Sequence, residues 1–239
     1  MAVSLLIIVT ARNEQTRLPS TLTALAEAFP GASLWVADDC STDATRRIAI
    51  ERGAEVISPD SSLGKGGAAT LAARAALATV ADPDATVVVL CDGDLGESAG
   101  RLDALVAAVS AEEADLAVAL FSRKTGGGFG LALGFARFAI RRRCGLRMSA
   151  PISGQRVMRA NVLAQLLPFA DGFGMEVGMT IDAARRGLRV AEIEVDLSHR
   201  ATKRTLRGFV HRGRQLIDFV RVYRARGYSR RVRIDHSSG

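Results

Sequence analysis

VVVLCDGDLGES, residues 87–98, begins as an apolar run that ends at Cys91 and then turns acidic within three residues. A continuous apolar run of this length, bounded by glycine, predicts a strand that is buried on both faces. Asp92 and Asp94 follow it directly, and two like charges this close repel each other unless a positive group lies between them. We therefore expect a buried strand whose carboxyl end binds a cation.

Short apolar runs of the same kind alternate with helical patterns along the first half of the chain. Strands are predicted at 5–11, 33–39, 54–58, 85–92 and 115–121, and helices around 18–29 and at 41–53, 64–80 and 98–110. This alternation is typical of right-handed βαβ units, so the predicted fold class is α/β with a mostly parallel sheet flanked by helices. Ligands on such sheets bind at the carboxyl ends of the strands. The polar residues predicted at those ends are Asn13, Glu14, Asp38, Asp39, Asp92 and Asp94.

The pattern is looser beyond residue 121. We expect a glycine-rich loop at 122–130, a helix that ends at Arg141–Arg143, a turn or short strand at 150–157, a loop entering a helix at 172–187, and a late strand at 188–199. No internal repeat or low-complexity linker interrupts the sequence. The chain is predicted to form one domain over 1–200, followed by a basic helical tail over 201–239.

Composition narrows the class of protein. The 239 residues are 48% hydrophobic, and no apolar run reaches the roughly 18 residues of a membrane span. The N-terminus lacks the basic region of a signal peptide and is interpreted as the first strand. The three cysteines are odd in number and widely spaced, which favours a reducing cytoplasm over a disulfide framework.

The tail carries most of the positive charge. Residues 200–233 hold twelve Arg or Lys and one acid, a local charge of +11 within a total of +7, so the remainder sums to −4. Apolar residues recur in it at helical spacing, which predicts an amphipathic basic helix. Three interpretations stay open: the helix docks on the domain, it joins two subunits in a homodimer, or it lies on an anionic membrane. Nucleic acid is not expected, because the tail has neither interleaved aromatics nor a DNA-binding motif.

Two acidic pairs are the candidates for ligand binding. Asp92 and Asp94 offer the carboxylate oxygens that Mg²⁺ or Mn²⁺ prefers, usually together with substrate phosphates; the alternative is a plain turn. Asp38 and Asp39 close the second strand and are placed to bind a base or ribose hydroxyls. The nearby Ser41 or Asp43 is predicted to cap the following helix.

Two basic features accompany these acids. Gly64-Lys65-Gly66-Gly67 fails the P-loop pattern, but a lysine at a helix N-terminus suits an anion; the alternative is a glycine turn with a solvated lysine. His199 ends the last predicted strand beside Arg200 and Arg204. It is a candidate metal ligand with basic neighbours suited to a diphosphate, although a lone histidine is commonly structural.

Four of the motifs in the first half of the chain resemble those of a known family. TARNE (10–14), VADDCSTDAT (36–45), GKGGA (64–68) and CDGDL (91–95) are similar, in order and spacing, to the nucleotide-sugar domain of family 2-type glycosyltransferases with the GT-A fold. The later segments more specifically resemble glucosyl-3-phosphoglycerate synthases. These segments are TGGGFG (125–130), PISGQRV (151–157), PFADGFGMEVGMTIDAARRGL (168–188) and SHRATKR (198–204).

The resemblance implies a role for each matching residue. Ala11 and Glu14 would line the nucleotide pocket, with Asp38 or Asp39 beside the uracil or ribose. Lys65 would contact the nucleotide, and Asp92 would reach the ribose or the metal. Asp94 and His199 would bind the divalent metal. Arg200 or Arg204 would neutralise the diphosphate, and Glu176 would approach the sugar hydroxyls.

The acceptor loop departs from the synthase pattern. Gly128, Phe129 and Leu131 occupy the places expected to bind the acceptor, but the synthases have an arginine and a threonine where Phe129 and Leu131 stand. Apolar side chains make no charge-assisted hydrogen bonds to phosphate. The resemblance therefore supports the donor half more than a 3-phosphoglycerate acceptor.

The predicted function is metal-dependent transfer of a sugar from a UDP-glucose-like donor to a small or lipid-linked acceptor. The catalytic candidates are Asp94, Glu176 and Arg200. Synthase-like transfer would retain the anomeric configuration without a dedicated base, whereas an inverting enzyme would use Glu176 as base. The alternative functions are a polyprenyl-phosphate glycosyltransferase, peripheral on the inner face of the membrane, and a sugar nucleotidylyltransferase. The latter is disfavoured because ARNEQTR follows the first strand.

Overall fold

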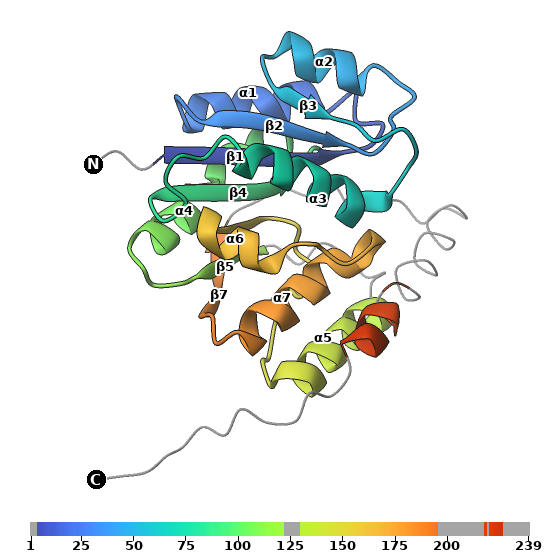
Figure 1. Cartoon of the computed structure of the whole chain (residues 1–239), viewed down its shortest axis with the longest axis vertical. Coiled ribbons are helices and arrows are strands. Elements are labelled where there is room, and N and C mark those ends of the chain that lie inside the picture. Colours follow the sequence, from blue (N-terminus) through green and yellow to red (C-terminus); the bar gives the residue numbers. More distant parts are fainter. Residues whose placement is uncertain (1–3, 122–129, 196–217, 219, 227–239) are drawn as a thin grey trace.

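The computed structural model describes residues 4–121, 130–195, 218 and 220–226, shown as coloured ribbon in Figure 1. Within these residues the strands form a seven-stranded sheet of order β3-β2-β1-β4-β6-β5-β7. Its strands are β1 (Ser4–Ala11), β2 (Ser33–Asp38), β3 (Glu55–Ile57), β4 (Thr86–Asp92), β5 (Leu116–Phe121), β6 (Arg156–Arg159) and β7 (Val190–Val195). β6 runs antiparallel to both of its neighbours, and the other strand pairs are parallel. The predicted α/β class with a mostly parallel sheet is confirmed.

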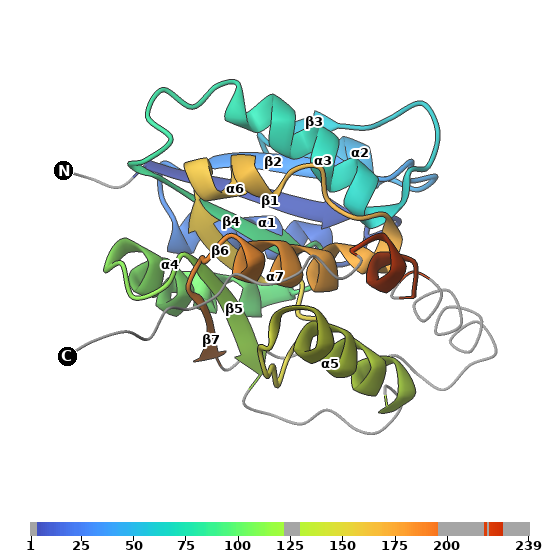
Figure 2. The same ribbon diagram turned by 60° about the horizontal axis from the view of Figure 1, so that its bottom comes forward.

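Helices cover both faces of this sheet. They are α1 (Leu18–Ala28), α2 (Thr45–Glu51), α3 (Gly64–Leu77), α4 (Asp103–Ser110), α5 (Gly130–Cys144), α6 (Ala160–Leu166) and α7 (Met175–Arg185), with short 3₁₀ helices η1 (Gly96–Leu102) and η2 (Gly172–Gly174). Figure 2 shows α3, α6 and α7 on one side of the strands and α1 and α4 on the other.

The two helical layers follow from the period of two in a strand. Leu6 and Ile8 of β1 point into a core shared with α3, α5, α6 and α7. Ile7 and Val9 point the other way, into a core shared with α1, α2, η1 and α4. Side chains alternate across a strand, so a strand covered on both faces needs apolar residues at every position. The continuous apolar runs in the sequence are the consequence.

Several boundaries differ from the predicted ones. The helix expected at 41–53 begins only at Thr45, and Ala44 holds its N-cap position. Ser41 is not the cap, because its hydroxyl hydrogen-bonds the Asp38 carboxylate instead. Asp43 accepts a hydrogen bond from the Thr45 N–H at 2.9 Å, so it does contact the helix start. The helix α6, directly after β6, was not predicted, because no capping side chain marks its start.

The described part of the tail docks on the domain. Val222 is buried in the same core as α5 and α7, and Arg226 forms an ion pair with Asp182 of α7. The ring of Tyr223 lies 6.0 Å from the rings of Phe135 and Phe138 in α5, centroid to centroid. In Figure 1 this short red helix lies beside α5. The domain-docking interpretation therefore holds for residues 218–226, apart from 219, which lies outside the described residues.

Among the described helices, none has the length and apolar character needed to cross a bilayer.

Close backbone approach makes Gly66 a sensitive position, and Gly134 is its matched control. A Cβ at Gly66 of α3 would collide with the backbone carbonyl of Ala170, 2.9 Å from its carbon atom, whereas a Cβ at Gly134 of α5 would meet nothing within 4 Å. Gly66→Ala should lower the free energy of unfolding by about 1–3 kcal/mol. Gly134→Ala should raise it by up to about 1 kcal/mol, since alanine favours a helix. Urea unfolding measures both, and equal effects would contradict the packing of α3 on Ala170.

Candidate active site

The order of strands creates a switch point between β1 and β4. The chain runs from β1 to β2 and β3 on one side and then returns to β4 on the other. Thr10 is in register with Asp92 of β4, and Ala11 with Asp38 of β2. The carboxyl ends of β1, β2 and β4 therefore lie together, at the position where open α/β sheets bind ligands. The structure brings the predicted polar residues to this one edge.

Lys65 lies between two carboxylates at this edge. Its Nζ is 2.5 Å from Oδ1 of Asp92 and 2.6 Å from Oε1 of Glu176. Burial alone would lower the pKa of Lys65, but the two carboxylates outweigh it and the pKa is raised. Lys65 is thus the positive group that Asp92 requires. We call Lys65, Asp92 and Glu176 the ion cluster.

The antiparallel strand β6 brings a further partner to Asp92. Arg156 at the start of β6 is in register with Leu90 of β4, so the residue before it lies beside the end of β4. The Gln155 side-chain amide donates to Oδ2 of Asp92 at 2.9 Å, and the Thr10 hydroxyl donates to Oδ1 at 3.1 Å. Gly154 lies against the cluster, since a Cβ there would come within 2.8 Å of Lys65 Nζ. No role was predicted for these residues, although Gln155 belongs to the PISGQRV match.

Arg156 is fully buried and connects the two segments that hold the ion cluster. Its Nε donates to the Ser153 carbonyl at 2.9 Å, and its Nη1 donates to the Thr180 hydroxyl of α7 at 2.9 Å. The Thr180 hydroxyl in turn donates to the Glu176 carbonyl at 3.0 Å. Burial lowers the pKa of Arg156 to about 10, against the opposing effect of nearby carboxylates, so it remains cationic at neutral pH. We interpret Arg156 as a positioning residue for Gln155 and Glu176.

Asp94 lies next to the ion cluster in sequence but has a more open environment. Its side chain is 32% exposed, and its Oδ2 is 3.6 Å from Nη1 of Arg17. Burial, and then the charge of Asp94, raises the pKa of Glu14 to about 7, although Arg17 acts in the opposite direction. The Asp94 carboxylate is therefore partly exposed and within electrostatic range of Glu14, and it can take a cation as a further partner.

Asp94 fits a divalent cation as a single carboxylate ligand. Mg²⁺ and Mn²⁺ are hard cations that commonly bind one or two carboxylates and complete their shells with substrate phosphates and water. Among the described residues, no group of three or more His, Cys, Asp or Glu side chains could hold a metal without such help. The second predicted ligand, His199, lies outside the described residues.

Asp38 and Asp39 are buried and support the loop that precedes Lys65. Asp38 accepts hydrogen bonds from the Ser58 hydroxyl at 3.1 Å and from the Ser41 N–H. Asp39 accepts from the N–H groups of Leu63 and Gly64, at 2.8 and 3.0 Å, and pairs with Arg12. The Asp39 N–H donates to the Ala11 carbonyl at 3.0 Å. The nucleotide contacts of Ala11, Asp38 and Asp39 stay predictions. In the structure Asp39 fixes the start of α3, while Asp38 holds Ser41 and Ser58 of the adjoining loops.

The remaining predicted residues lie largely outside the described part of the chain. His199, Arg200, Gly128 and Phe129 fall in ranges that the structure does not describe. Leu131 lies in the first turn of α5, and its side chain is not described. The described residues of the site are therefore those that the resemblance assigns to donor binding, and this assignment stays a prediction.

Comparison with known proteins identifies the family. The model of glycosyl transferase family 2 matches residues 6–167. An undecaprenyl-phosphate mannosyltransferase of Micrococcus luteus is 31% identical over 211 residues, which cover 82% of this chain and 84% of that protein. The chain belongs to glycosyl transferase family 2 and is a glycosyltransferase.

Solved structures agree with this assignment. Glucosyl-3-phosphoglycerate synthase from Mycobacterium tuberculosis, in complex with Mn²⁺, UDP-glucose and phosphoglyceric acid, matches with 26% identity and a TM-score of 0.72 over 93% of this chain and 80% of that one. The complex of the same enzyme with Mg²⁺ and UDP matches with 25% identity and a TM-score of 0.72, over 93% of this chain and 79% of that one. The predicted GT-A fold and the synthase resemblance are confirmed.

Replacing Arg156 tests its role as a positioning residue. Arg156→Met leaves the Ser153 carbonyl and the Thr180 hydroxyl buried without their donor, so the free energy of unfolding should fall by about 1–3 kcal/mol. Arg147→Met, at an exposed position before the same loop, should change it by less than about 0.5 kcal/mol. Urea denaturation measures both. Equal effects would show that the buried hydrogen bonds of Arg156 contribute nothing specific.

The raised pKa of Glu14 predicts a pH dependence of stability. The folded protein keeps this proton up to about pH 7, whereas the unfolded chain releases it near 4.5. Stability should therefore fall as the pH rises from 4.5 to 7, by about 1 kcal/mol once solvent screening of this half-buried group is allowed for. Glu14→Gln should remove that slope, while Glu27→Gln on an exposed face of α1 should keep it. Thermal unfolding in EDTA across this pH range measures the slope for each protein. An unchanged slope in Glu14→Gln would show that Glu14 is not the group whose pKa is raised by folding.

Proposed function

We propose that the enzyme transfers a sugar from a nucleotide diphosphate sugar, with UDP as the nucleotide, in a reaction that requires Mg²⁺ or Mn²⁺. The observation that carries this proposal is the ion cluster at the switch point, with Asp94 beside it. The M. tuberculosis synthase, whose solved complexes contain UDP-glucose with Mn²⁺ and UDP with Mg²⁺, supports the choice of donor and metal.

In this proposal the ion cluster binds the donor. Lys65 lies in the first turn of α3, where the helix dipole also favours an anion, so it contacts the nucleotide diphosphate. Binding of the diphosphate releases part of the attraction that holds Lys65 to Asp92 and Glu176. Asp92 then accepts hydrogen bonds from the ribose, and Glu176 accepts them from sugar hydroxyls. Glu14 and Ala11 line the nucleotide pocket.

The divalent cation would be held by Asp94, with His199 as the second protein ligand. When bound, it neutralises the diphosphate as this group leaves the sugar, which lowers the barrier to breaking the C1–O bond. Arg200 contributes positive charge to the same leaving group. The protein's part is to orient the donor, and Gln155 and Thr10 contribute by fixing both oxygens of Asp92.

Retention of the anomeric configuration is part of this proposal and is what the resemblance to the synthases implies. The leaving phosphate takes the acceptor proton, so no protein base is needed. Glu176 is the side chain that an inverting mechanism would use as base. Its Oε1 already lies 2.6 Å from Lys65 Nζ, which suits a fixed hydrogen-bond acceptor for the sugar better than a mobile proton acceptor.

A lipid-linked phosphate is the acceptor that we infer, and two observations favour it. The mannosyltransferase of M. luteus, which is 31% identical, is named for undecaprenyl phosphate, whereas the synthase complex contains phosphoglyceric acid. Both names include a phosphate-bearing compound other than a nucleotide sugar, so we infer a phosphorylated acceptor here. Phe129 and Leu131 stand where the synthase pattern has polar residues, and this favours the lipid phosphate over 3-phosphoglycerate.

Titration calorimetry with UDP tests the donor site. In Mn²⁺ the protein should bind UDP, and chelation by EDTA should weaken binding. Asp94→Asn should weaken metal-dependent binding at least about tenfold, which is 1.4 kcal/mol, without changing thermal stability by more than a degree or two. Asp103→Asn, an exposed residue at the start of α4, is the control and should bind normally. Equal affinity of all three proteins with and without EDTA would refute the proposal.

A transfer assay with the same proteins extends this test to the acceptor. Donor hydrolysis is first screened with UDP-, GDP- and ADP-sugars in Mg²⁺ or Mn²⁺. The preferred donor is then offered a short-chain polyprenyl phosphate or 3-phosphoglycerate. Faster transfer to 3-phosphoglycerate would contradict the preference for a lipid phosphate while leaving the donor assignment intact.

A further inference from the structure

We propose that α5 and the docked tail helix together form a surface that binds anionic membranes. The surface consists of Phe138 at its centre and the exposed arginines around it, and we call it the α5–tail face. Its members are Phe138, Arg137, Arg141 and Arg142 of α5, with Tyr223, Arg221 and Arg224 of the tail. This inference rests on the proposed function only in one respect, the lipid-linked acceptor that a membrane bound at this face would bring to the site.

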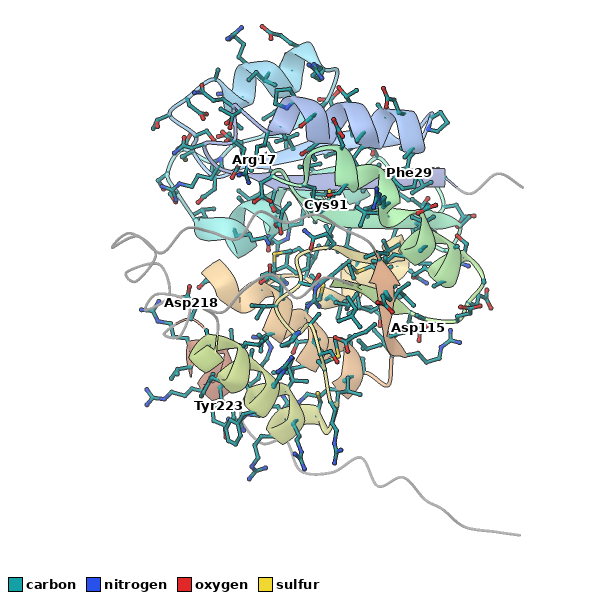
Figure 3. The ribbon with its side chains drawn as sticks, turned by 180° about the vertical axis from the view of Figure 1, so that it is seen from behind. Arg17, Phe29, Cys91, Asp115, Asp218 and Tyr223 are labelled. Carbon is teal, nitrogen blue, oxygen red and sulfur yellow. The ribbon has the colours of Figure 1, made fainter. Side chains whose placement is uncertain are left out.

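An exposed aromatic side chain is the first observation. Phe138 is 52% exposed, although its neighbours Ala136, Ala139 and Ile140 are buried. Arg141 and Arg142 follow at helical spacing on the same face of α5. The ring of Phe138 lies 6.0 Å from the ring of Tyr223, so α5 and the tail helix share one aromatic patch. Figure 3 shows side chains with nitrogen tips pointing away from the molecule around the labelled Tyr223.

The charge of this face is the second observation. Helix α5 contains no acidic residue, and the described part of the tail contains one, Asp218, which pairs with Arg221 at 3.4 Å. Arg226 is paired with Asp182, whereas Arg143 stacks over Tyr223 and keeps its positive charge beside the face. The exposed arginines therefore exceed the carboxylates. A basic face with an aromatic residue at its centre complements anionic headgroups, which attract the arginines while the ring inserts shallowly.

The way the tail is held explains why this face is stable. Val222 is buried between α5 and α7, and the Arg226–Asp182 pair closes the end of the helix. The apolar side of the helix is thus occupied by protein, whereas Arg221 and Arg224 are exposed. Docking on the domain and binding to a membrane use different sides of one helix and are compatible.

The face is also continuous with the segment that carries Glu176. A Cβ at Gly172 would lie 3.1 Å from Cγ of Asp218, so the tail helix packs against η2. Helix α7, with Glu176 in its first turn, follows η2 directly. A membrane bound at the α5–tail face would therefore lie near the sugar-binding end of the site. This placement suits an acceptor whose phosphate is anchored by a lipid.

Vesicle sedimentation of the full chain tests the proposal. The protein should pellet with phosphatidylglycerol vesicles at low salt, dissociate at high salt, and remain in the supernatant with phosphatidylcholine vesicles. Arg141→Glu with Arg224→Glu should weaken binding at least about 25-fold, since each arginine near an anionic surface contributes about fivefold. Phe138→Ser should weaken binding to the same vesicles while leaving the charge unchanged.

Matched controls come from helices elsewhere on the protein. Ile50 of α2 is 57% exposed, and Arg46 and Arg74 are exposed on α2 and α3. Arg46→Glu with Arg74→Glu makes the same change in net charge, and Ile50→Ser removes a comparable exposed apolar side chain. Both control proteins should pellet nearly as well as the wild type. UDP binding by all variants should be unchanged, so a failure of the donor proposal would be seen separately.

Four results would overturn the inference. The wild type could remain in the supernatant with anionic vesicles at low salt. The control pair of arginine substitutions could abolish pelleting as fully as the α5–tail pair, which would assign binding to overall charge. Alternatively, Phe138→Ser could convert a dimer to a monomer in sedimentation velocity, or the arginine pair could abolish binding to transfer RNA, with no vesicle binding in either case. The face would then bind a second copy or a nucleic acid.

Discussion

The ammonium group of Lys65, shared by Asp92 and Glu176, is the interaction on which the arrangement of this site depends. The three side chains come from α3, β4 and α7, which are far apart in sequence. A buried carboxylate without a cation is strongly unfavourable, and removing one partner of a buried pair commonly costs about 3–5 kcal/mol. The ion pairs therefore stabilise one particular arrangement of α3, β4 and α7 relative to one another.

Glycine makes that placement sterically possible. Gly66 lets α3 approach the Ala170 carbonyl, and Gly154 lets the loop before β6 lie directly on Lys65 and Asp92. A side chain at either position would separate the charged groups. The glycines of the GKGG and SGQ segments thus allow backbone segments to approach closely, in addition to any contact with a ligand.

The fold was largely predictable because it depends on local patterns. Continuous apolar runs such as 5–11 and 85–92 indicate strands covered on both faces, and the intervening helices force parallel pairing. The placement of β6 was not predictable in this way, because four residues, Arg156–Arg159, carry no alternation that distinguishes an inserted antiparallel strand from a turn. The short helix α6 was missed because its start carries no capping side chain.

In the site too, residues placed by local sequence patterns were predictable, and contacts that depend on tertiary packing were not. Asp92, Asp94 and Glu14 could be placed at strand ends from sequence, because parallel strands bring their carboxyl ends to one edge. The sequence predicted that Lys65 binds an anion, but it did not identify Asp92 and Glu176 as its partners. The contact with Glu176 depends on how α7 packs on α3. The role of Arg156 was invisible for the same reason, as a buried arginine on a strand is recognised only from the carbonyl and hydroxyl groups that surround it.

The antiparallel direction of β6 has a functional consequence. A strand that runs against its neighbours begins where they end, so the residues just before β6 arrive at the ligand-binding edge of the sheet. Gln155 reaches Asp92 by this route, and Arg156 then joins that loop to α7. Helix α7 is in turn in contact with the tail helix through Asp182 and Arg226. One reversed strand therefore connects the acidic turn after β4 to α7 and the tail helix, through the hydrogen bonds of Gln155 and Arg156 and the Arg226–Asp182 ion pair.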